Sequence, residues 1–568
     1  MRGTRHGWTT VLALGCLCFG AHAQAPAGQV AYDILIAQGR GGFQGPLMAG
    51  DAFGSSGAAI GDVDGDGIGD LAVGANFDSE GVIGCCWHPG ALWILFLETD
   101  SSVKGSQKIN NLHGGFSGML LESNFFGSSI AVLGDLDGNG TADLAVGAPG
   151  TTAAGKSSAG AIWVLMLQPD GTVKSTFKIT QGFGGFSGPL HDGDSFGNSV
   201  AAIGDCDGDG IGDLAVGASG DDDGGVSTGA VWLLFLQPDG TVKSQHKVSP
   251  LEGGFSGPLH ALDWFGVAVA SVGDLDGDGT PDLAVGAPQD DDGASEAGAV
   301  WILFLTPDGT VKSHQKISAA TGGFAGPLDP SDWFGISLAS VADLDGDGRR
   351  DLAVGARFDD DGVDHLYGDY GAVWILFPNA DGTLHGQQKI SKTQGGLGAA
   401  LPQGASFGAS IGAVGDLNGD GADDLIVGQT GPTYAKGNAW LLFLRRAQWT
   451  WLGQGLAGSS GVPELFCQGT LLPNQPVSLS LAHSLPGAPL TLVLGLSEAG
   501  LAFKGGVLVP QPDVLIPGNS SALGTWSLLA KWPSGVPVGL HAYLQAWQVD
   551  PGAAQGFAAS NALVAVTP

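Results

Sequence analysis

The sequence predicts an all-β protein, a six-bladed β-propeller followed by a small C-terminal β-sandwich. Three observations predict this fold. An acidic phrase of Asp and Gly returns six times, every 69–73 residues. Each copy follows a Phe-Gly pair and precedes an apolar run that carries one Trp. Each repeat contains four strand signals, and radially stacked repeats of four strands form a propeller.

The composition favours a folded chain over a low-complexity one. Gly accounts for 100 of the 568 residues, but 43% of the residues are hydrophobic, with 15 Trp and 25 Phe. We therefore interpret Gly as turn residues between many short strands. The net charge of −34 argues against nucleic acid and anionic membranes as partners, and it makes divalent cations natural partners.

The N-terminus is typical of a secretory signal peptide, residues 1–23. Two Arg precede a short apolar run, and the small residues AHA end it at the spacing of a cleavage site. No other apolar span approaches the length of a membrane helix, so we expect no transmembrane segment after cleavage. The sequence therefore predicts a protein that is secreted, extracellular or on the cell surface.

The four strand signals of one repeat stand in order in residues 172–236. TVKSTFKIT alternates between apolar and polar residues, as in a strand with one wet face, and a long loop with GGFSGPL follows. FGNSVAAIG and DLAVGA are the next two strands, and AVWLLFL is apolar at every position. Runs that are apolar on both sides belong to strands covered on both faces, so we expect neighbouring sheets to enclose them.

The two ends of the repeat array predict how the ring closes. The first copy opens with a strand in which Ile36 lies seven residues before a Phe, as in later copies. The last copy ends at GNAWLLFLRR and lacks this strand. We therefore expect a strand near 30–38 to pair with the strand at 438–444, which leaves no unpaired sheet edge. The propeller then covers residues 29–447.

The C-terminal part of the chain is different. Residues 448–463 are predicted to be a linker, because they include a Gly/Ser-rich stretch. Beyond them the acidic phrase is absent, and short apolar strands alternate with Pro and Gly turns. This pattern favours a small β-sandwich over residues 464–568.

The acidic phrase, D-x-[DN]-G-[DN]-G-x-x-D-L, has the composition of a metal-binding loop. Oxygen ligands at positions 1, 3, 5 and 9 of a tight loop converge on one point, Gly at positions 4 and 6 allows positive φ, and position 7 adds its carbonyl. These are the hard ligands that Ca²⁺ prefers, and soft N or S ligands are absent from the phrase. The alternative is that Asp and Gly only form turns. Four like charges so close together, however, repel one another unless a cation lies among them.

The phrase, with Phe-Gly before it and Gly-Ala after it, resembles the FG-GAP family, which occurs in the integrin α-subunit propeller and in many secreted bacterial proteins. The resemblance covers about residues 30–445. One difference is that the integrin head has seven blades and this sequence has six copies. The resemblance implies a Ca²⁺-binding β-hairpin loop in each repeat, about six ions in all.

The expected ligands follow the phrase position by position. They are Asp62, Asp64, Asp66, the Ile68 carbonyl and Asp70 in loop one (62–70); Asp135, Asp137, Asn139, the Thr141 carbonyl and Asp143 in loop two (135–143); Asp205, Asp207, Asp209, the Ile211 carbonyl and Asp213 in loop three (205–213); Asp274, Asp276, Asp278, the Thr280 carbonyl and Asp282 in loop four (274–282); Asp343, Asp345, Asp347, the Arg349 carbonyl and Asp351 in loop five (343–351); and Asp416, Asn418, Asp420, the Ala422 carbonyl and Asp424 in loop six (416–424). Asn lowers the charge of loops two and six, so we expect these two to bind Ca²⁺ most weakly.

A second acidic motif reads DDDG at 221–224, 290–293 and 359–362, with FDSEG at 77–81 as a weaker version. It is either a solvated acidic rim or a surface for a ligand or a second cation. The repeated Trp residues are either core residues or platforms for sugar stacking. Four Cys remain after signal cleavage, Cys85, Cys86, Cys206 and Cys467. They form no zinc-type pairs, and their disulfide pairing stays open.

The sequence contains no H-E-x-x-H, G-x-S-x-G, phosphate-binding loop or Cys/His cluster. We therefore expect a non-enzymatic adhesion or recognition module for an extracellular protein or glycan. One alternative is a structural component of an envelope or matrix. A less favoured one is a propeller-based hydrolase or lyase, which would need converging His, Asp, Glu or Tyr in a central channel.

Overall fold

The computed structural model describes residues 27–568 apart from 81–87, 362–368, 399–400, 420, 432–434, 447–448, 454, 461, 469–475, 483, 505, 522–523, 534–535, 537–539, 554, 561 and 567–568. The predicted signal peptide, residues 1–23, lies outside this part. The described residues form two compact units, Ala27–Leu452 and a C-terminal unit from Gly453 onward. Within the described residues, no helix has the length and apolar character needed to cross a membrane.

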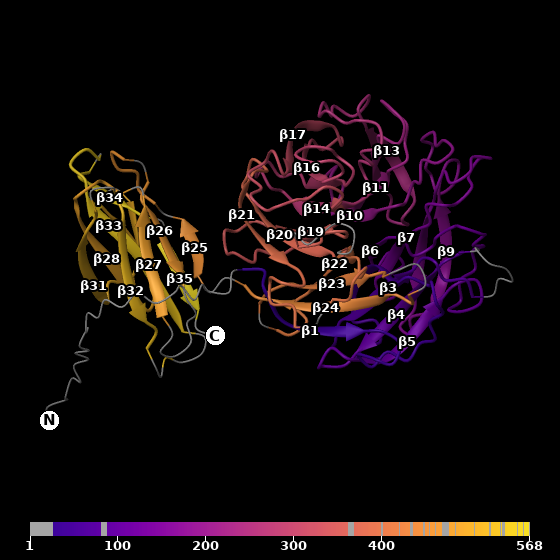
Figure 1. Ribbon diagram of the computed structural model, residues 1–568, viewed down its shortest axis with the longest axis horizontal. Helices are drawn as coiled ribbons and strands as arrows, with labels where there is room; N and C mark the ends of the chain where they lie inside the picture. Colours follow the sequence, from indigo (N-terminus) through magenta and orange to yellow (C-terminus); the bar gives the residue numbers. More distant parts are fainter. Residues whose placement is uncertain are drawn as a thin grey trace. The chain divides into compact units, whose positions relative to one another are not determined.

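The first unit contains six four-stranded antiparallel sheets, the blades of a propeller (Figure 1). From first to fourth strand, the blades are β2 (Phe53–Gly61), β3 (Asp70–Ala75), β4 (Ala91–Leu97) and β5 (Val103–Ile109); β6 (Ile130–Gly134), β7 (Asp143–Gly147), β8 (Ile162–Leu167) and β9 (Val173–Ile179); β10 (Val200–Gly204), β11 (Asp213–Ala218), β12 (Ala230–Leu236) and β13 (Val242–Val248); β14 (Val269–Gly273), β15 (Asp282–Ala287), β16 (Ala299–Leu305) and β17 (Val311–Ser318); β18 (Phe334–Val341), β19 (Asp351–Ala356), β20 (Ala372–Pro378) and β21 (Leu384–Ile390); and β22 (Phe407–Gly415), β23 (Asp424–Gln429), β24 (Asn438–Leu444) and β1 (Val30–Ile36). The prediction of a six-bladed all-β propeller is confirmed.

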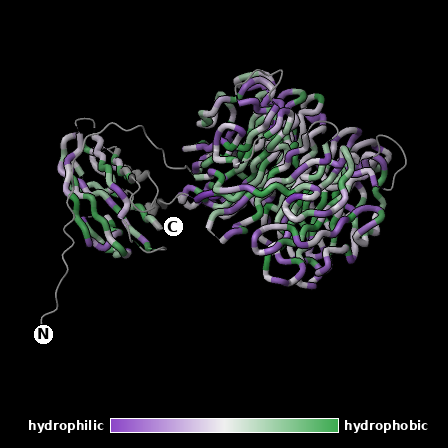
Figure 2. The backbone as a smooth tube through the Cα atoms, turned by 60° about the horizontal axis from the view of Figure 1, so that its bottom comes forward, coloured by the Kyte–Doolittle hydropathy of each residue, from purple (hydrophilic) through white to green (hydrophobic). Residues whose placement is uncertain are grey.

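Burial follows the sequence pattern along each blade. In the third blade, every residue of β11 and β12 is buried, whereas the outer strand β13 is buried at its two ends and exposed or half-buried between them. Figure 2 shows the corresponding hydrophobic segments running through the blades, with hydrophilic segments in the loops. The middle strands are thus enclosed by neighbouring sheets, as their uninterrupted apolar runs predict.

The core lies between adjacent blades. Phe186, from the loop before the third blade, stacks on Phe196 with ring centroids 4.9 Å apart and meets Trp232 edge to face at 5.1 Å. The same cluster contains Val164 of the second blade. The six repeated Trp residues are buried at 1–8% exposure, so they are core residues. The hypothesis that they are sugar-stacking platforms is wrong.

The ring closes through the N-terminal strand, as predicted. β1 pairs antiparallel with β24, with Ile34 opposite Leu441 and Leu35 opposite Trp440. The first strands of the last and first blades, β22 and β2, also lie in contact. Ser410 Oγ donates a hydrogen bond of 2.7 Å to the Gly54 carbonyl across this junction. The first and last repeats are therefore joined both within one sheet and between neighbouring sheets.

The chain after the propeller is also all β, as predicted. One sheet contains β25 (Trp449–Gly453), β35 (Ala562–Val566), β33 (His541–Val549), β28 (Pro489–Gly495) and β31 (Val514–Asn519), with β34 (Phe557–Ala559) paired to β33; a second contains β26 (Glu464–Gln468), β27 (Pro476–Ala482) and β32 (Trp526–Lys531); and a hairpin contains β29 (Glu498–Phe503) and β30 (Gly506–Pro510). Within the predicted linker, residues 449–453 form the strand β25. The sequence WTWLG has the aromatic and β-branched residues of a strand, and the Gly/Ser-rich stretch begins only after it.

Of the Cys residues expected to remain after signal cleavage, some lie in the part of the chain that the structure describes and some lie outside it. Cys206 is buried and has a free thiol, and burial raises its pKa to about 12. A thiol held protonated in this way is a small apolar side chain rather than a reactive one. Cys85 and Cys86 lie outside the described residues.

Candidate metal centres

Each acidic loop is the hairpin between the first and second strands of its blade. In loop three, between β10 and β11, Gly208 and Gly210 have φ of +77° and +89°. These are the fourth and sixth positions of the phrase, where positive φ is predicted. The tight curl needs a residue without Cβ at both points.

The first Asp of each loop shapes its backbone. Asp205 Oδ1 accepts the N–H groups of Gly208 at 2.8 Å and Asp209 at 3.0 Å, and its Oδ2 accepts the N–H of Gly210 at 2.8 Å. Equivalent bonds form around Asp62, Asp274 and Asp343. The first carboxylate therefore holds the backbone of the loop in its curl.

The ninth Asp attaches the loop to the body of the blade. Asp213 is buried, its Oδ2 accepts the N–H of Cys206 at 2.9 Å, and its Oδ1 accepts the N–H of Leu236, at the end of the third strand, at 3.0 Å. Burial raises the pKa of this carboxyl, and in loops four and five it raises the pKa of Asp282 to about 6 and that of Asp351 to about 9. Neighbouring loop carboxylates add to each shift. The loops therefore concentrate negative charge that a cation would relieve.

The structure brings the predicted carboxylates together. Ligand oxygens of Asp205, Asp207 and Asp213 lie within 4.8 Å of one another in loop three. The same limit holds for Asp62, Asp64 and Asp66 in loop one, for Asp135, Asp137 and Asp143 in loop two, and for Asp274, Asp276 and Asp282 in loop four. These hard oxygen donors fit Ca²⁺.

Some predicted ligands are not brought into these groups. Asn139 Nδ2 donates to the Leu167 carbonyl at 2.7 Å, and its Oδ1 accepts the N–H of Thr141 at 2.7 Å, as Asp209 Oδ1 accepts the N–H of Ile211 in loop three. Asp420 of loop six lies outside the described residues. The carbonyl ligands at position 7 stay predictions, and so does the weak binding of loops two and six.

A basic side chain from the fourth strand reaches into the loops. Lys243 Nζ lies 2.6 Å from Asp207 Oδ2 and also pairs with Asp209. Lys104 and Lys312 pair in the same way with Asp64 and Asp66 and with Asp276 and Asp278, and Lys174 pairs with Asp137. Hydrogen bonds from these lysines lower the pKa of Asp66, Asp209 and Asp278. An incoming metal ion must displace this ammonium group.

Sequence reasoning missed these lysines, although a signal existed. The lysine directly follows the first residue of the fourth strand in blades one to four, in the repeated dipeptide Val-Lys. Hydrogen bonding in the sheet brings it back beside a loop that lies 34–38 residues earlier in the chain.

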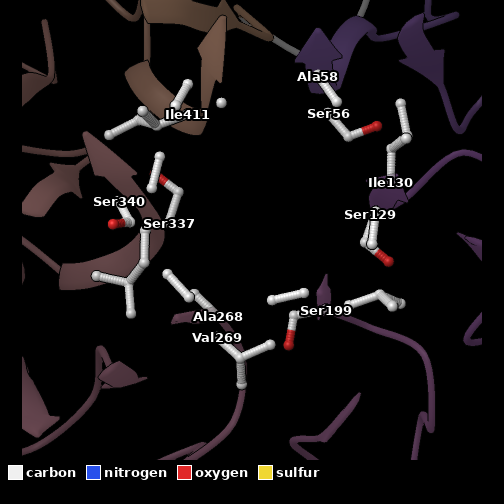
Figure 3. A pocket seen from close by; sticks show the side chains of 18 of the residues that line it. Ser56, Ala58, Ser129, Ile130, Ser199, Ala268, Val269, Ser337, Ser340 and Ile411 are labelled. Carbon is white, nitrogen blue, oxygen red and sulfur yellow. The ribbon is translucent and has the colours of Figure 1, made fainter. Parts of the chain in front are cut away.

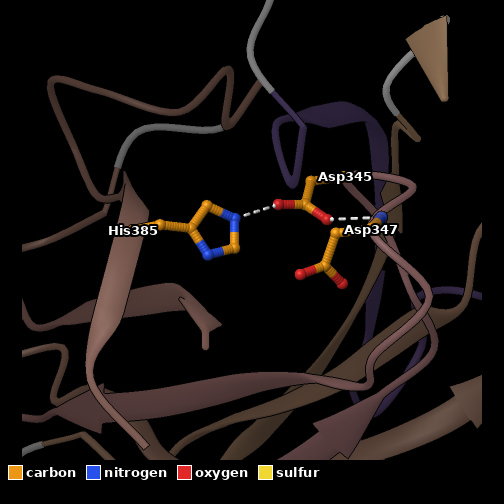
Figure 4. Close-up of side chains that lie close together, drawn as sticks. All are labelled: Asp345, Asp347 and His385. Carbon is orange, nitrogen blue, oxygen red and sulfur yellow. Dashed lines mark hydrogen bonds and ion pairs between the residues drawn. The ribbon is translucent and has the colours of Figure 1, made fainter. Parts of the chain in front are cut away.

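Loop five has a different side chain at this position, His385 of β21 (Figure 4). His385 Nε2 lies 2.6 Å from Asp345 Oδ2, and the ligand atoms of His385, Asp345 and Asp347 lie within 4.8 Å of one another. The loop phrases contain only oxygen ligands, as noted from the sequence. In loop five the fourth strand therefore brings a nitrogen atom beside these oxygens from 40 residues away.

The second acidic motif is neutralised by another set of lysines. Lys389 is buried between Asp359, at 2.7 Å, and Asp361, at 3.0 Å, and Lys247 contacts Asp221 and Asp223, each at 2.7 Å. Lys316 and Lys108 occupy the same place in blades four and one. The first Asp of each motif is at most 2% exposed, so the solvated-rim hypothesis is wrong for that residue. Residues 81 and 362, which end two of the motifs, lie outside the described part.

The first strands of the six blades surround a cavity of about 560 Å³ on the propeller axis (Figure 3). Serine and small aliphatic side chains line it, including Ser129, Ser199 and Ile411. Several of the serines join neighbouring blades; Ser199 Oγ, for example, donates to the Gly266 carbonyl at 2.8 Å. Among the described residues of the lining, Arg350 is the one charged side chain, and His, Cys, Tyr, Asp and Glu are absent.

The FG-GAP repeat model matches five segments of the chain, residues 126–165, 196–234, 265–303, 334–376 and 407–442. Integrin alpha-PS2 of Drosophila melanogaster is 32% identical over 249 residues, 43% of this chain and 16% of that protein. Integrin alpha-5 of Xenopus laevis is 33% identical over 240 residues, 41% of this chain and 20% of that protein. The match therefore spans at most a fifth of the length of these relatives.

A solved structure of an exo-beta-1,3-galactanase from Phanerochaete chrysosporium aligns with 96% of this chain and 100% of its own, at 10% identity and a TM-score of 0.28. A likeness this low carries no inference about fold or activity.

Proposed function

Because this chain is an FG-GAP repeat protein, similar to the propeller of integrin α subunits, we propose that it is a calcium-stabilised recognition module without enzymatic activity. It acts outside the cell or at the cell surface, on a protein or glycan ligand. The convergent carboxylates of the acidic loops carry the proposal. Ca²⁺ bound there supplies positive charge, and the first and ninth Asp of each loop hold the hairpin in shape around it.

The distribution of exposed apolar side chains supports recognition. The strands of each blade are antiparallel, so the loops after the second and fourth strands lie at the end opposite the acidic hairpins. In the described part of the propeller, all exposed large hydrophobic side chains except Tyr32 lie in these loops: Met48, Phe77, Leu112, Met119, Leu121, Phe183, Val226, Leu251 and Leu262. Apolar side chains gathered on one face are typical of a surface that binds a macromolecule. We therefore place ligand binding at this end.

The axial cavity supports a function other than catalysis. General acid–base or nucleophilic chemistry needs groups such as His, carboxylates, Cys or Tyr within reach of a substrate. The described lining offers serine hydroxyls that already donate to backbone carbonyls, together with Arg350. Arg350 Nε itself donates to Ser340 Oγ at 2.7 Å.

The test is binding of the whole chain to an array of glycans and to a panel of purified extracellular proteins. Each measurement is made in about 1 mM Ca²⁺ and again in excess chelator. We expect at least one specific ligand, with binding lost in chelator and restored by Ca²⁺. Binding to none of the probes, or turnover of a glycan probe by the protein, would contradict the proposal.

A further inference from the structure

We propose that loop five is a separate metal centre that takes a nitrogen-preferring dication such as Zn²⁺ through His385, Asp345 and Asp347. The other acidic loops present oxygen ligands and are assigned to Ca²⁺. This inference concerns one loop and one additional ion. It stands or falls independently of calcium binding at the other loops.

The donor set points to this class of ion. An imidazole nitrogen suits Zn²⁺, Co²⁺, Ni²⁺ and Cu²⁺, whereas Ca²⁺ takes oxygen ligands. His385 Nε2 faces Asp345 across 2.6 Å, and Asp347 lies beside them on the same loop (Figure 4). The imidazole is 38% exposed, so an ion can reach it from solvent. Three protein ligands with an open position are sufficient for a zinc site.

The other blades show what His385 replaces. In blade five, Leu384 pairs with the last residue of the third strand, and His385 follows it. In each of the first four blades, a lysine follows the residue at the corresponding position. An ammonium group on these carboxylates competes with a metal ion and cannot become a ligand while it is charged. An imidazole at the same point can donate a lone pair to the ion. One substitution thus converts a competing cation into a ligand.

The surroundings of loop five disfavour Ca²⁺ in particular. Arg349 Nη1 lies 2.8 Å from Asp347 Oδ2, and Arg446 Nη2 lies 3.4 Å from Asp343 Oδ2. Two guanidinium groups reduce the net negative charge on which an oxygen-only site for Ca²⁺ depends. A bond from nitrogen to a transition-metal ion adds affinity that does not depend on this charge.

The experiment titrates the full chain with Zn²⁺ in the presence of about 1 mM Ca²⁺, using calorimetry and metal analysis. We expect one Zn²⁺ ion per chain from loop five. His385→Gln and His385→Lys should each lose that ion, and Lys is the residue that four other blades carry at this position. His191→Gln is the matched control, because His191 is exposed and pairs with Asp194 at 3.6 Å, away from the acidic hairpins; it should keep the ion. Co²⁺ in place of Zn²⁺ should give a visible absorption band that is lost in the His385 variants.

A gain-of-function variant tests the register position itself. Lys243→His places an imidazole beside Asp207 and Asp209 of loop three and should add a second Zn²⁺ ion per chain. The proposal is overturned if wild type and His385→Gln bind the same number of Zn²⁺ ions. It is also overturned if Lys243→His, folded with wild-type thermal unfolding in Ca²⁺, binds no more Zn²⁺ than wild type.

Discussion

At the scale of single residues, the acidic loops divide their carboxylates between two tasks. Asp207 is partly exposed in loop three, where it pairs with Lys243 and is accessible to an ion. Asp213, six residues later, is buried and accepts N–H groups from two segments of the blade. The phrase shows four equivalent Asp positions, but the structure makes only some of them accessible.

The two tasks predict different effects of substitution. Asp213→Ala leaves the buried N–H groups of Cys206 and Leu236 without acceptors, so we expect it to lower the free energy of unfolding by about 2–5 kcal/mol in Ca²⁺ and in chelator alike. Asp207→Ala should lose one bound Ca²⁺ and change stability in chelator only slightly. Urea unfolding and metal analysis of both variants make the comparison. Equal stability losses in chelator would contradict this division of roles.

A buried carboxyl on the opposite end of the fifth blade predicts a pH dependence. Asp332 accepts the N–H of Asp329 at 2.8 Å, and burial, with Asp359 nearby, raises its pKa from 3.8 to about 8. The folded protein keeps this proton where the unfolded chain releases it. Stability should therefore fall by about 1.4 kcal/mol per pH unit as the pH rises from about 4 to about 8.

Asp332→Asn tests this dependence, and blade two already has an asparagine at this position. Asn124 occupies the equivalent position and accepts the N–H of Leu121 at 2.8 Å. The variant keeps an acceptor without a titratable group, so we expect a flatter profile and higher stability near pH 8. Urea unfolding at a series of pH values is the measurement. Parallel profiles for wild type and Asp332→Asn would rule out the raised pKa.

At the scale of elements, the fourth strand in each of blades one to four carries two lysines that contact different parts of the blade. The first lysine reaches the acidic hairpin, and the second, four residues later, lies over the core Trp and meets the second acidic motif. In blade five, Lys389 is 4% exposed between two carboxylates. In blade two, Thr151 stands where blade five has Asp359, and no described carboxylate pairs with Lys178.

Replacing these two lysines should have opposite results. Lys389→Met leaves buried carboxylates unpaired and should cost about 3–5 kcal/mol of stability. Burial lowers the pKa of Lys178, which lies 5.8 Å from the Trp163 ring, so Lys178→Met removes a charge that is costly to bury and should be neutral or stabilising. Urea unfolding of both variants at pH 7 measures the difference. A similar loss in both would show that packing on Trp, and not the ion pair, is what the lysines contribute.

The same elements show what sequence reasoning can reach. The strands DLAVGA and AVWLLFL are evident because their residues carry the pattern locally, and the hairpin glycines are fixed by a local need for positive φ. The contacts of Lys243, His385 and Lys389 are set by pairing between strands, so nothing within one repeat phrase reveals them. The strand 449–453 was assigned to a linker because the Gly/Ser-rich residues after it dominated the composition.

At the scale of the whole molecule, closure of the ring is predictable from which strands the first and last repeats contain. The repeat array begins with a fourth strand and ends with a third, and β1 and β24 pair within one sheet. Six blades then place six acidic hairpins on one end of the propeller and the exposed apolar loops on the other. With a net charge of −34 over the whole chain, we expect cations bound at the hairpin end to offset the repulsion there.

The most direct measurement is the number of Ca²⁺ ions that the full chain binds in equilibrium dialysis. It is combined with the midpoint of thermal unfolding in Ca²⁺ and in chelator. For a Kd of about 10⁻⁴–10⁻³ M per loop, about 1 mM Ca²⁺ adds roughly 0.4–1.4 kcal/mol at each occupied loop. At saturating Ca²⁺ we expect about five ions per chain, one for each loop other than loop five, and a midpoint that is lower by several degrees in chelator. No bound Ca²⁺ and an unchanged midpoint would contradict the claim that metal ions complete these hairpins.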